Sequence, residues 1–315
     1  MQFFDKTNIN FVKERHLFFI LSSLVLTVGV ILVLVLGIDF GIDFTGGSEV
    51  AIKFEQKVST DAVRDAVKKG GVFAEEVKSY GADNQFLIRL KEVGRISDKI
   101  EEALKAEMPQ NKFEVLKTDT IGPKIGEELT IQALIAVILS MIGIMIYVTF
   151  RFKFEYGFAA LFALAHDVVF TIIVIVIVHK LGFINLEFNQ NIVAALLTVV
   201  GYSVNDTVII FDRIRENLDK VKGVSFQKLV NTSINETLSR TINTVITVIV
   251  VLLTIVLFGG PVLEGFAFTM LVGLVVGAYS SIYIASSLVI WYLEKRGRIA
   301  HDDSYDKKKK AVAAV

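Results

Sequence analysis

Uncharged apolar stretches alternate with charged segments along this chain of 315 residues. A helix needs about 20 predominantly apolar residues to cross the core of a bilayer, and six stretches come close to that length. They comprise residues 17–38, 129–150, 157–178, 191–211, 241–258 and 265–293. The first is too long for the apolar part of a signal peptide and lacks a small-residue cleavage site, so we expect it to remain as an anchor. The pattern therefore predicts six spanning helices, the first at 17–38 and five more within a bundle at 129–293.

Lys and Arg gather on one side of these predicted spans. They are frequent in the N-terminal segment 1–16, in the loop 212–240 and in the tail 294–315, whereas the opposite short loops hold Lys180 alone. Short cytoplasmic loops carry the excess of Lys and Arg, while long domains cross the membrane largely regardless of their charge. We therefore expect both termini in the cytoplasm and segment 39–128 on the extracytoplasmic side.

Segment 39–128 has the pattern of a small α/β domain. Its apolar residues alternate in some stretches and recur at helical spacing in others. Ser59 and Ser97 can cap two helices, and residues 81–84 have the composition of a turn. The predicted elements are a strand at 49–55, a helix at 60–69, strands at 76–80 and 85–91, a helix after Ser97, and a strand at 113–117. This β-α-β-β-α-β order is that of a ferredoxin-like α+β domain.

The loop 212–240 is not uniformly polar. Apolar residues recur at helical spacing from Phe226 to Leu238. This spacing is typical of an amphipathic helix at the membrane surface. A solvated hairpin that packs on the other loops is the alternative, and the sequence leaves both open.

The composition and the motifs of the chain argue against several classes of function. Lys and Arg number 33, as do Asp and Glu, so the net charge does not indicate a nucleic-acid partner. The chain has no cysteine, which excludes disulfides and thiolate chemistry. Its four histidines lack paired spacing, and the sequence contains no phosphate loop or nucleophile elbow. We therefore expect no metal, no other cofactor and no enzymatic activity.

Asp206 is the leading functional candidate because it lies inside the predicted fourth span. Charged residues in a spanning helix are costly and usually face the bundle interior, a partner or a water path. Burial favours the neutral carboxyl group and a nearby cation favours the charged one, so such a group can gain and lose a proton. The pattern predicts a proton-relay carboxylate with Tyr202 and Asn205 as supporting polar residues. An aspartate that only hydrogen-bonds neighbouring helices is the alternative.

Arg240 opens the predicted fifth span and shares a helix face with Thr244. Arginine stays protonated in proteins, so it could act as the counter-ion of Asp206, with Thr244 as a further polar group. An arginine at a cytoplasmic helix end is also commonly an orientation anchor. The pattern alone favours the anchor.

Asp167 follows His166 near the middle of the predicted third span. Neighbouring residues point to different sides of a helix, so their spacing predicts no His–Asp dyad. Asp167 could serve the same water path as Asp206, or it could hold helices together through hydrogen bonds. The sequence favours neither role, and a structural role is the simpler interpretation of His166.

The first span is followed directly by the stretch Asp39-Phe40-Gly41-Ile42-Asp43-Phe44-Thr45-Gly46-Gly47. Its paired glycines permit a tight turn into the first strand. The acidic residues could bind a cation, but their spacing lacks the EF-hand pattern. A structural junction is the favoured interpretation.

Two long runs give the sequence a family resemblance. The first is Gly41-Ile42-Asp43-Phe44-Thr45-Gly46-Gly47, and the second is Val200-Gly201-Tyr202-Ser203-Val204-Asn205-Asp206-Thr207-Val208-Ile209-Ile210-Phe211-Asp212-Arg213-Ile214-Arg215-Glu216-Asn217. In this order they resemble the signatures of the SecF family of bacterial protein-export membrane proteins. The six-span plan with a large segment after the first span extends the resemblance to the whole chain, without the SecD half of fused forms.

The resemblance implies a role in protein transport. SecF is similar in plan to half of a transporter of the RND superfamily and pairs with SecD. The pair associates with the SecYEG translocon and indirectly with SecA, and YajC and YidC are further partner candidates. SecDF is thought to use the proton motive force to help an unfolded polypeptide through the bacterial inner membrane after the SecA-driven step.

The resemblance also assigns residues. The family's carboxylate in the fourth span corresponds to Asp206, and its arginine at the start of the fifth corresponds to Arg240. Asp167 lies in the family's His-Asp-Val run of the third span. Two other functions stay open: half of an RND-type small-molecule exporter, which would need a second half, and a non-energised translocon scaffold, which would not need carboxylates in the membrane.

Overall fold

The computed structural model describes residues 7–300 except 95 and 222, so the first six residues and the basic tail beyond residue 300 lie outside the description. Within this range six helical spans are long and apolar enough to cross a membrane, as predicted. After a 3-10 turn (Val12–Glu14), the spans are α1 (Arg15–Leu36), α5 (Pro123–Arg151), α6 (Phe154–Lys180), α7 (Gln190–Lys220), α8 (Phe226–Phe258), and a last span composed of α9 (Pro261–Ser280), a π-helical turn (Ser281–Ala285) and α10 (Ser286–Lys295).

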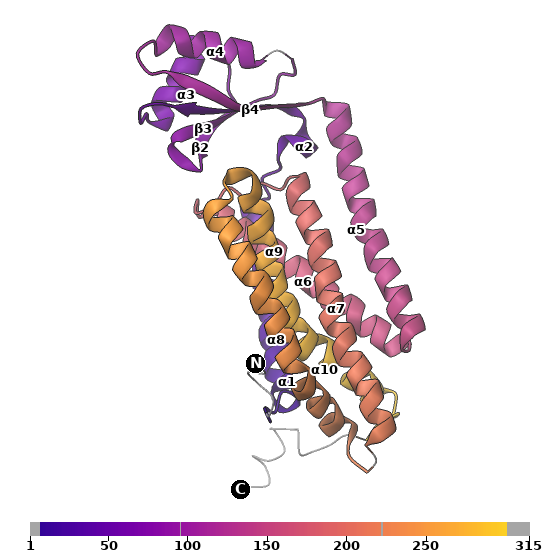
Figure 1. The fold of residues 1–315 in the computed structure, drawn as a ribbon. Coiled ribbons are helices and arrows are strands. Elements are labelled where there is room, and N and C mark those ends of the chain that lie inside the picture. The colour runs from indigo at the N-terminus through magenta and orange to yellow at the C-terminus, as the bar shows by residue number, and fades with distance from the viewer. Residues whose placement is uncertain (1–6, 95, 222, 301–315) are drawn as a thin grey trace.

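An α/β domain follows α1 and sits at one end of the bundle (Figure 1). Its four antiparallel strands have the spatial order β2-β3-β1-β4. The elements are α2 (Ile42–Thr45), β1 (Gly47–Phe54), α3 (Thr60–Lys69), β2 (Glu76–Tyr80), β3 (Ala82–Leu90), α4 (Ile96–Glu107) and β4 (Phe113–Ile121). This topology confirms the predicted ferredoxin-like domain.

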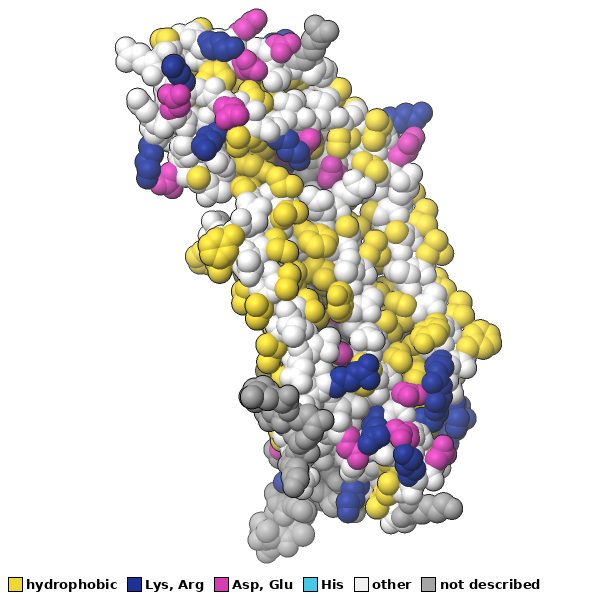
Figure 2. Space-filling view, in the orientation of Figure 1, with side chains coloured by type: hydrophobic (Ala, Val, Ile, Leu, Met, Phe, Trp, Pro, Cys, Tyr) yellow, Lys and Arg dark blue, Asp and Glu magenta, His cyan; other side chains and the backbone are white. Residues whose placement is uncertain are grey.

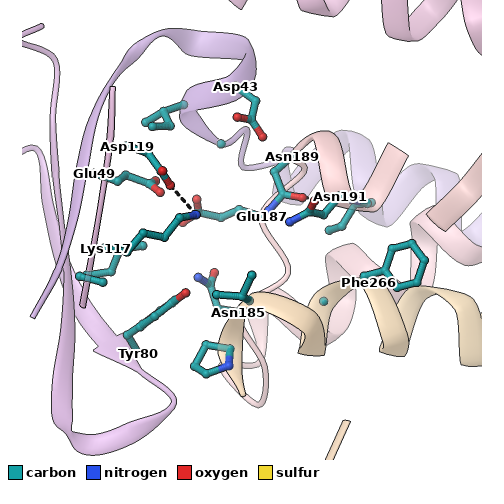
Figure 3. Close-up of a pocket in the computed structure, with 18 residues that line it drawn as sticks. Asp43, Glu49, Tyr80, Lys117, Asp119, Asn185, Glu187, Asn189, Asn191 and Phe266 are labelled. Atoms are coloured by element: carbon teal, nitrogen blue, oxygen red, sulfur yellow. Dashed lines mark hydrogen bonds and ion pairs between the residues drawn. The ribbon is translucent and has the colours of Figure 1, made fainter. Parts of the chain in front are cut away.

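Alternation along the strands divides the domain into two faces. Val50, Ile52 and Phe54 of β1 are fully buried, and they form a core with α3 and α4. The opposite face of the sheet turns toward the bundle and carries charged residues such as Glu49 and Lys117 (Figure 3). The apolar side of the sheet thus holds the domain together, and the polar side meets the membrane-spanning part.

Several predicted boundaries were wrong. Ser97 lies inside α4, which begins at Ile96, and Gly81 alone separates β2 from β3, so residues 82–84 belong to a strand rather than a turn. The predicted loop 212–240 is mostly helical: α7 continues to Lys220 and α8 begins at Phe226. The amphipathic stretch is therefore the first part of α8 rather than a separate surface helix. With the end of α7 it forms a helical hairpin, which agrees with the alternative interpretation, and Arg213 of α7 pairs with Glu236 of α8 across it.

The burial of the spans distinguishes the centre of the bundle from its surface. In the most apolar 18-residue stretches of α6 and α7, 44% and 50% of residues are buried, compared with 11%, 6% and 11% in those of α1, α5 and α8. Figure 2 shows charged side chains at both ends of the molecule and a broad hydrophobic band between them. This distribution is that of a multi-pass membrane protein whose outer helices face lipid or a partner.

Candidate functional site

Asp167 of α6 lies at the centre of a buried hydrogen-bond network. The residue has no exposed surface. Its Oδ2 accepts hydrogen bonds from the hydroxyl of Ser203 in α7 at 2.5 Å and from that of Ser280 in α9 at 2.8 Å. Its Oδ1 lies 2.9 Å from Nδ1 of His166. One carboxylate therefore connects three helices.

His166 extends the network to a fourth helix. Its Nε2 lies 2.8 Å from the hydroxyl of Ser22 in α1. A neutral imidazole can donate from Nδ1 to Asp167 and accept at Nε2 from the hydroxyl of Ser22, so both ring nitrogens of His166 have a hydrogen-bond partner. The prediction that spacing provides no His–Asp dyad was wrong, because adjacent side chains on a helix can bend toward one another when both are enclosed by neighbouring helices.

Two glycines of α9 allow this convergence. A Cβ atom at Gly273 would overlap the side chain of Val199, and one at Gly277 would lie 2.9 Å from the Cβ of Ser203. Small residues let helices approach closely in a membrane. Because α9 packs so tightly on α7, Ser203 and Ser280 reach the same oxygen of Asp167.

Asp206 lies one turn beyond Ser203 on α7 and is 5% exposed, so its carboxyl group is inside the bundle. The positive charge of Arg240 in α8 acts on it. Among the described residues, no hydrogen bond or ion pair within 4 Å joins the two side chains, and Arg240 itself is exposed. The two residues predicted as a pair are therefore close enough to interact electrostatically, but they form no direct hydrogen bond or ion pair.

None of the three predicted supporting residues forms a hydrogen bond with Asp206 in the described part of the chain. Tyr202 is 39% exposed, and Asn205 is exposed as well, so both face away from the bundle interior. The hydroxyl of Thr244 donates to the backbone oxygen of Arg240 at 3.0 Å. The buried face of α7 carries Ser203 and Thr207 in place of Tyr202 and Asn205.

A second polar region joins the α/β domain to the bundle. Glu187, in the connection between α6 and α7, is 6% exposed and forms ion pairs with Arg89 of β3 and Lys78 of β2. Arg89 also donates from Nε to Glu49 at 2.9 Å. Sequence reasoning missed Glu187, since an isolated glutamate in a short loop carries no pattern.

A small polar cleft of about 100 Å³ lies beside Glu187, between the sheet and the ends of α7 and α9 (Figure 3). Lys117 and Asp119 form an ion pair on its sheet side. Burial lowers the pKa of Lys117, but the hydrogen bond and the charge of Asp119, together with the nearby Tyr80 and Glu49, outweigh burial and hold the pKa above its ordinary value. Burial also raises the pKa of Tyr80. These charges are engaged with one another, so the cleft is part of the junction.

The stretch after α1 completes this junction. Lys180 donates to both carboxylate oxygens of Asp39, at 2.8 and 2.7 Å, and Asp43 accepts from the backbone nitrogen of Gln190 at 2.8 Å. At Gly47 the φ angle is +125° and a Cβ atom would lie 2.6 Å from the backbone oxygen of Leu90, which favours glycine. These contacts agree with the structural interpretation of the stretch.

The fold and the polar sites define a class of protein: a multi-pass membrane protein built as a six-helix bundle with one ferredoxin-like domain. Comparison with known proteins narrows this class. The family described as "Protein export membrane protein SecD/SecF, C-terminal" matches residues 99–295, and the "SecD/SecF GG Motif" matches residues 31–58. The second match contains the glycine pair of the junction.

Relatives named "Protein translocase subunit SecF" match nearly the whole chain. The protein of Rhodothermus marinus is 38% identical over 303 residues, covering 95% of this chain and 97% of the relative. That of Escherichia coli O157:H7 is 34% identical over 287 residues, covering 89% and 87%. The chain therefore belongs to the SecF family, and the resemblance seen in its sequence is confirmed.

Solved structures agree with this assignment. The crystal structure of SecDF from Thermus thermophilus, described as a translocon-associated membrane protein, has a TM-score of 0.81 and 37% identity. A SecDF structure in a "Super-membrane-facing form" has a TM-score of 0.68 and 34% identity. Each match covers 93% of this chain, which spans 39% and 40% of those longer chains.

Proposed function

We propose that this chain pairs with a SecD chain and that the complex uses the proton motive force to assist protein export through SecYEG after the SecA-driven step. The termini then lie in the cytoplasm, the helices in the bacterial inner membrane, and the α/β domain on the outer side, where an unfolded polypeptide emerges. YajC and YidC are further candidate partners.

Exposed polar groups within the spans support the pairing with SecD. Tyr202 and Asn205 of α7 and Asn243 of α8 are exposed on helices that are otherwise suited to lipid. Polar side chains are costly against hydrocarbon and are usually covered by protein. The SecDF relatives are more than twice as long as their matched part, and a SecD chain would supply the other half.

The observation that carries the energy-coupling proposal is the buried position of Asp206 near, but not bonded to, the charge of Arg240. Such a carboxyl group can exchange a proton without first breaking a direct ion pair. One proton that crosses 100 mV releases about 2.3 kcal/mol, which is enough to bias a two-state equilibrium more than tenfold. The charged form favours one packing of α7 against α8, and the protonated form releases it.

Replacement of Asp206 tests this proposal. In cells, Asp206→Asn should abolish the part of export that depends on the proton gradient, because asparagine cannot carry the proton. Asp212→Asn is the matched control: this aspartate lies on the same helix but is exposed and pairs with Arg151 and Arg215. Wild-type export by the Asp206 variant would overturn the proposal, and co-purification with SecD and SecYEG would test the partners.

A further inference from the structure

The network around Asp167 connects the helix that carries Asp206 to the helix that carries the α/β domain. On one side, Ser203 is one turn before Asp206 on α7 and donates to Asp167. On the other side, His166 reaches Ser22 of α1. Because α1 leads through residues 37–46 into β1, it is one of the two spans, with α5, that are joined directly to the domain.

The network responds as a unit because its members share one charge. Asp167 accepts from Ser203 and Ser280 at the same oxygen and is bonded to His166 at the other. Linked hydrogen bonds in a medium of low dielectric polarise one another. If Ser203 moves away with α7, the carboxylate binds the imidazole more strongly, and the imidazole then accepts more strongly from Ser22.

The last span has a structural feature that allows such a movement. Ser280 is directly followed by the π-helical turn Ser281–Ala285, and the hydroxyl of Ser286 donates to the backbone oxygen of Ser281 at 3.0 Å. Single π-helical turns occur frequently at functional sites and interrupt the regular ladder of backbone hydrogen bonds. The helix on the far side of Asp167 can therefore adjust its register while α6 stays in place.

We infer that His166 and Asp167 are positioning residues that transmit the state of Asp206 from α7 to α1 and thereby to the α/β domain. This inference rests on the proposed proton-driven function. It assigns the network to the step after proton uptake: the network does not carry the proton but couples its arrival to movement. Ser22 is the member of the network that lies on α1, a different helix from the one that carries Asp206.

Ser22→Ala is the decisive variant. It removes the hydrogen bond between His166 and α1. The hydrogen bond from the hydroxyl of Tyr279 to the backbone oxygen of Phe18 in α1 stays in place, as do α7, Asp206 and Arg240. The full chain, with its SecD partner in proteoliposomes, would be assayed for proton transfer with an internal pH-sensitive dye. Movement would be followed by the distance between spin labels at Lys68→Cys in α3 and Lys220→Cys in α7, which are specific labels because the chain has no cysteine of its own.

We expect Ser22→Ala to retain proton transfer. The distance change that the proton gradient produces should fall about fivefold, because one buried hydrogen bond biases a two-state equilibrium by about that factor. Ser22→Thr keeps the hydroxyl and should restore the change. Ser23→Ala is the matched control, because Ser23 is the neighbouring serine on α1 and its hydroxyl, within the described part of the chain, donates only to the backbone oxygen of Phe19.

Two substitutions of His166 provide an independent test should Ser22→Ala not accumulate. Asparagine can replace the Nδ1 contact to Asp167, and glutamine can replace the Nε2 contact to Ser22, but neither makes both. Both variants should uncouple movement from proton transfer. Wild-type coupling in either, or the simultaneous loss of proton transfer and movement, would overturn the inference. Failure of the proposed function is distinguishable, because wild-type protein would then show no response to the gradient.

Discussion

The two polar regions of this protein bury acidic groups in different ways. Asp167, inside the bundle, is surrounded by hydroxyl groups and an imidazole, whereas Glu187, at the junction, is held by the cations of Arg89 and Lys78. Removing a cation from water costs several kcal/mol, and serine is much cheaper to bury. In this protein, neutral hydrogen-bond donors therefore stabilise a carboxylate at membrane depth, whereas ion pairs lie where a helix ends near water.

Removal of the central acceptor should have the largest effect. Asp167→Ala leaves the hydroxyls of Ser203 and Ser280 and the ring of His166 without their partner. Three lost hydrogen bonds of about 1 kcal/mol each would lower the free energy of unfolding by about 3 kcal/mol. Thermal unfolding of the purified protein measures this, with Asp212→Ala, at an exposed ion pair, expected to change little. Equal melting temperatures for both variants would show that the network contributes nothing.

The junction should tolerate a similar change better. Glu187→Ala leaves Arg89 and Lys78 with other acidic partners, Glu49 and Glu76, so we expect a loss of about 1–2 kcal/mol in the docking of the α/β domain. The loss should shrink at high salt, because screening already weakens the wild-type ion pairs. Hydrogen exchange of β2 and β3 measures docking. Glu75→Ala, which removes a more exposed pair with Lys91, is the control, and an equal effect of both variants would contradict the role of Glu187.

Acid should loosen the junction slightly. Burial raises the pKa of Asp39, but Lys180 and His179 outweigh it and hold the pKa below its ordinary value. The contribution of Asp39 is therefore fully present above about pH 4 and is lost as the pH falls through the lowered value. The effect should be small because Asp39 is 44% exposed. Hydrogen exchange of residues 37–46 between pH 5 and 3 measures it, and Asp39→Asn should remove the pH dependence.

Local elements were predictable to different degrees. The helix at residues 60–69 and the strand at residues 76–80 agree residue for residue with α3 and β2, because capping and alternation are local signals. The loop 212–240 was misjudged because its helices extend beyond the apolar stretches. Asn217 of α7 donates to Ser233 of α8 at 2.9 Å, and such contacts between two helices are invisible in the pattern of either one.

The sequence by itself determined the six spans, the ferredoxin-like domain and the presence of three costly polar residues, Asp167, Asp206 and Arg240, within or beside the spans. These follow from the length and period of hydrophobicity, which act within about 20 residues. Only the tertiary structure decided which groups meet. Ser22, Ser203 and Ser280 are unremarkable in sequence, and they converge on His166 and Asp167 because four helices pack at particular rotations and at the close distance that the glycines of α9 permit.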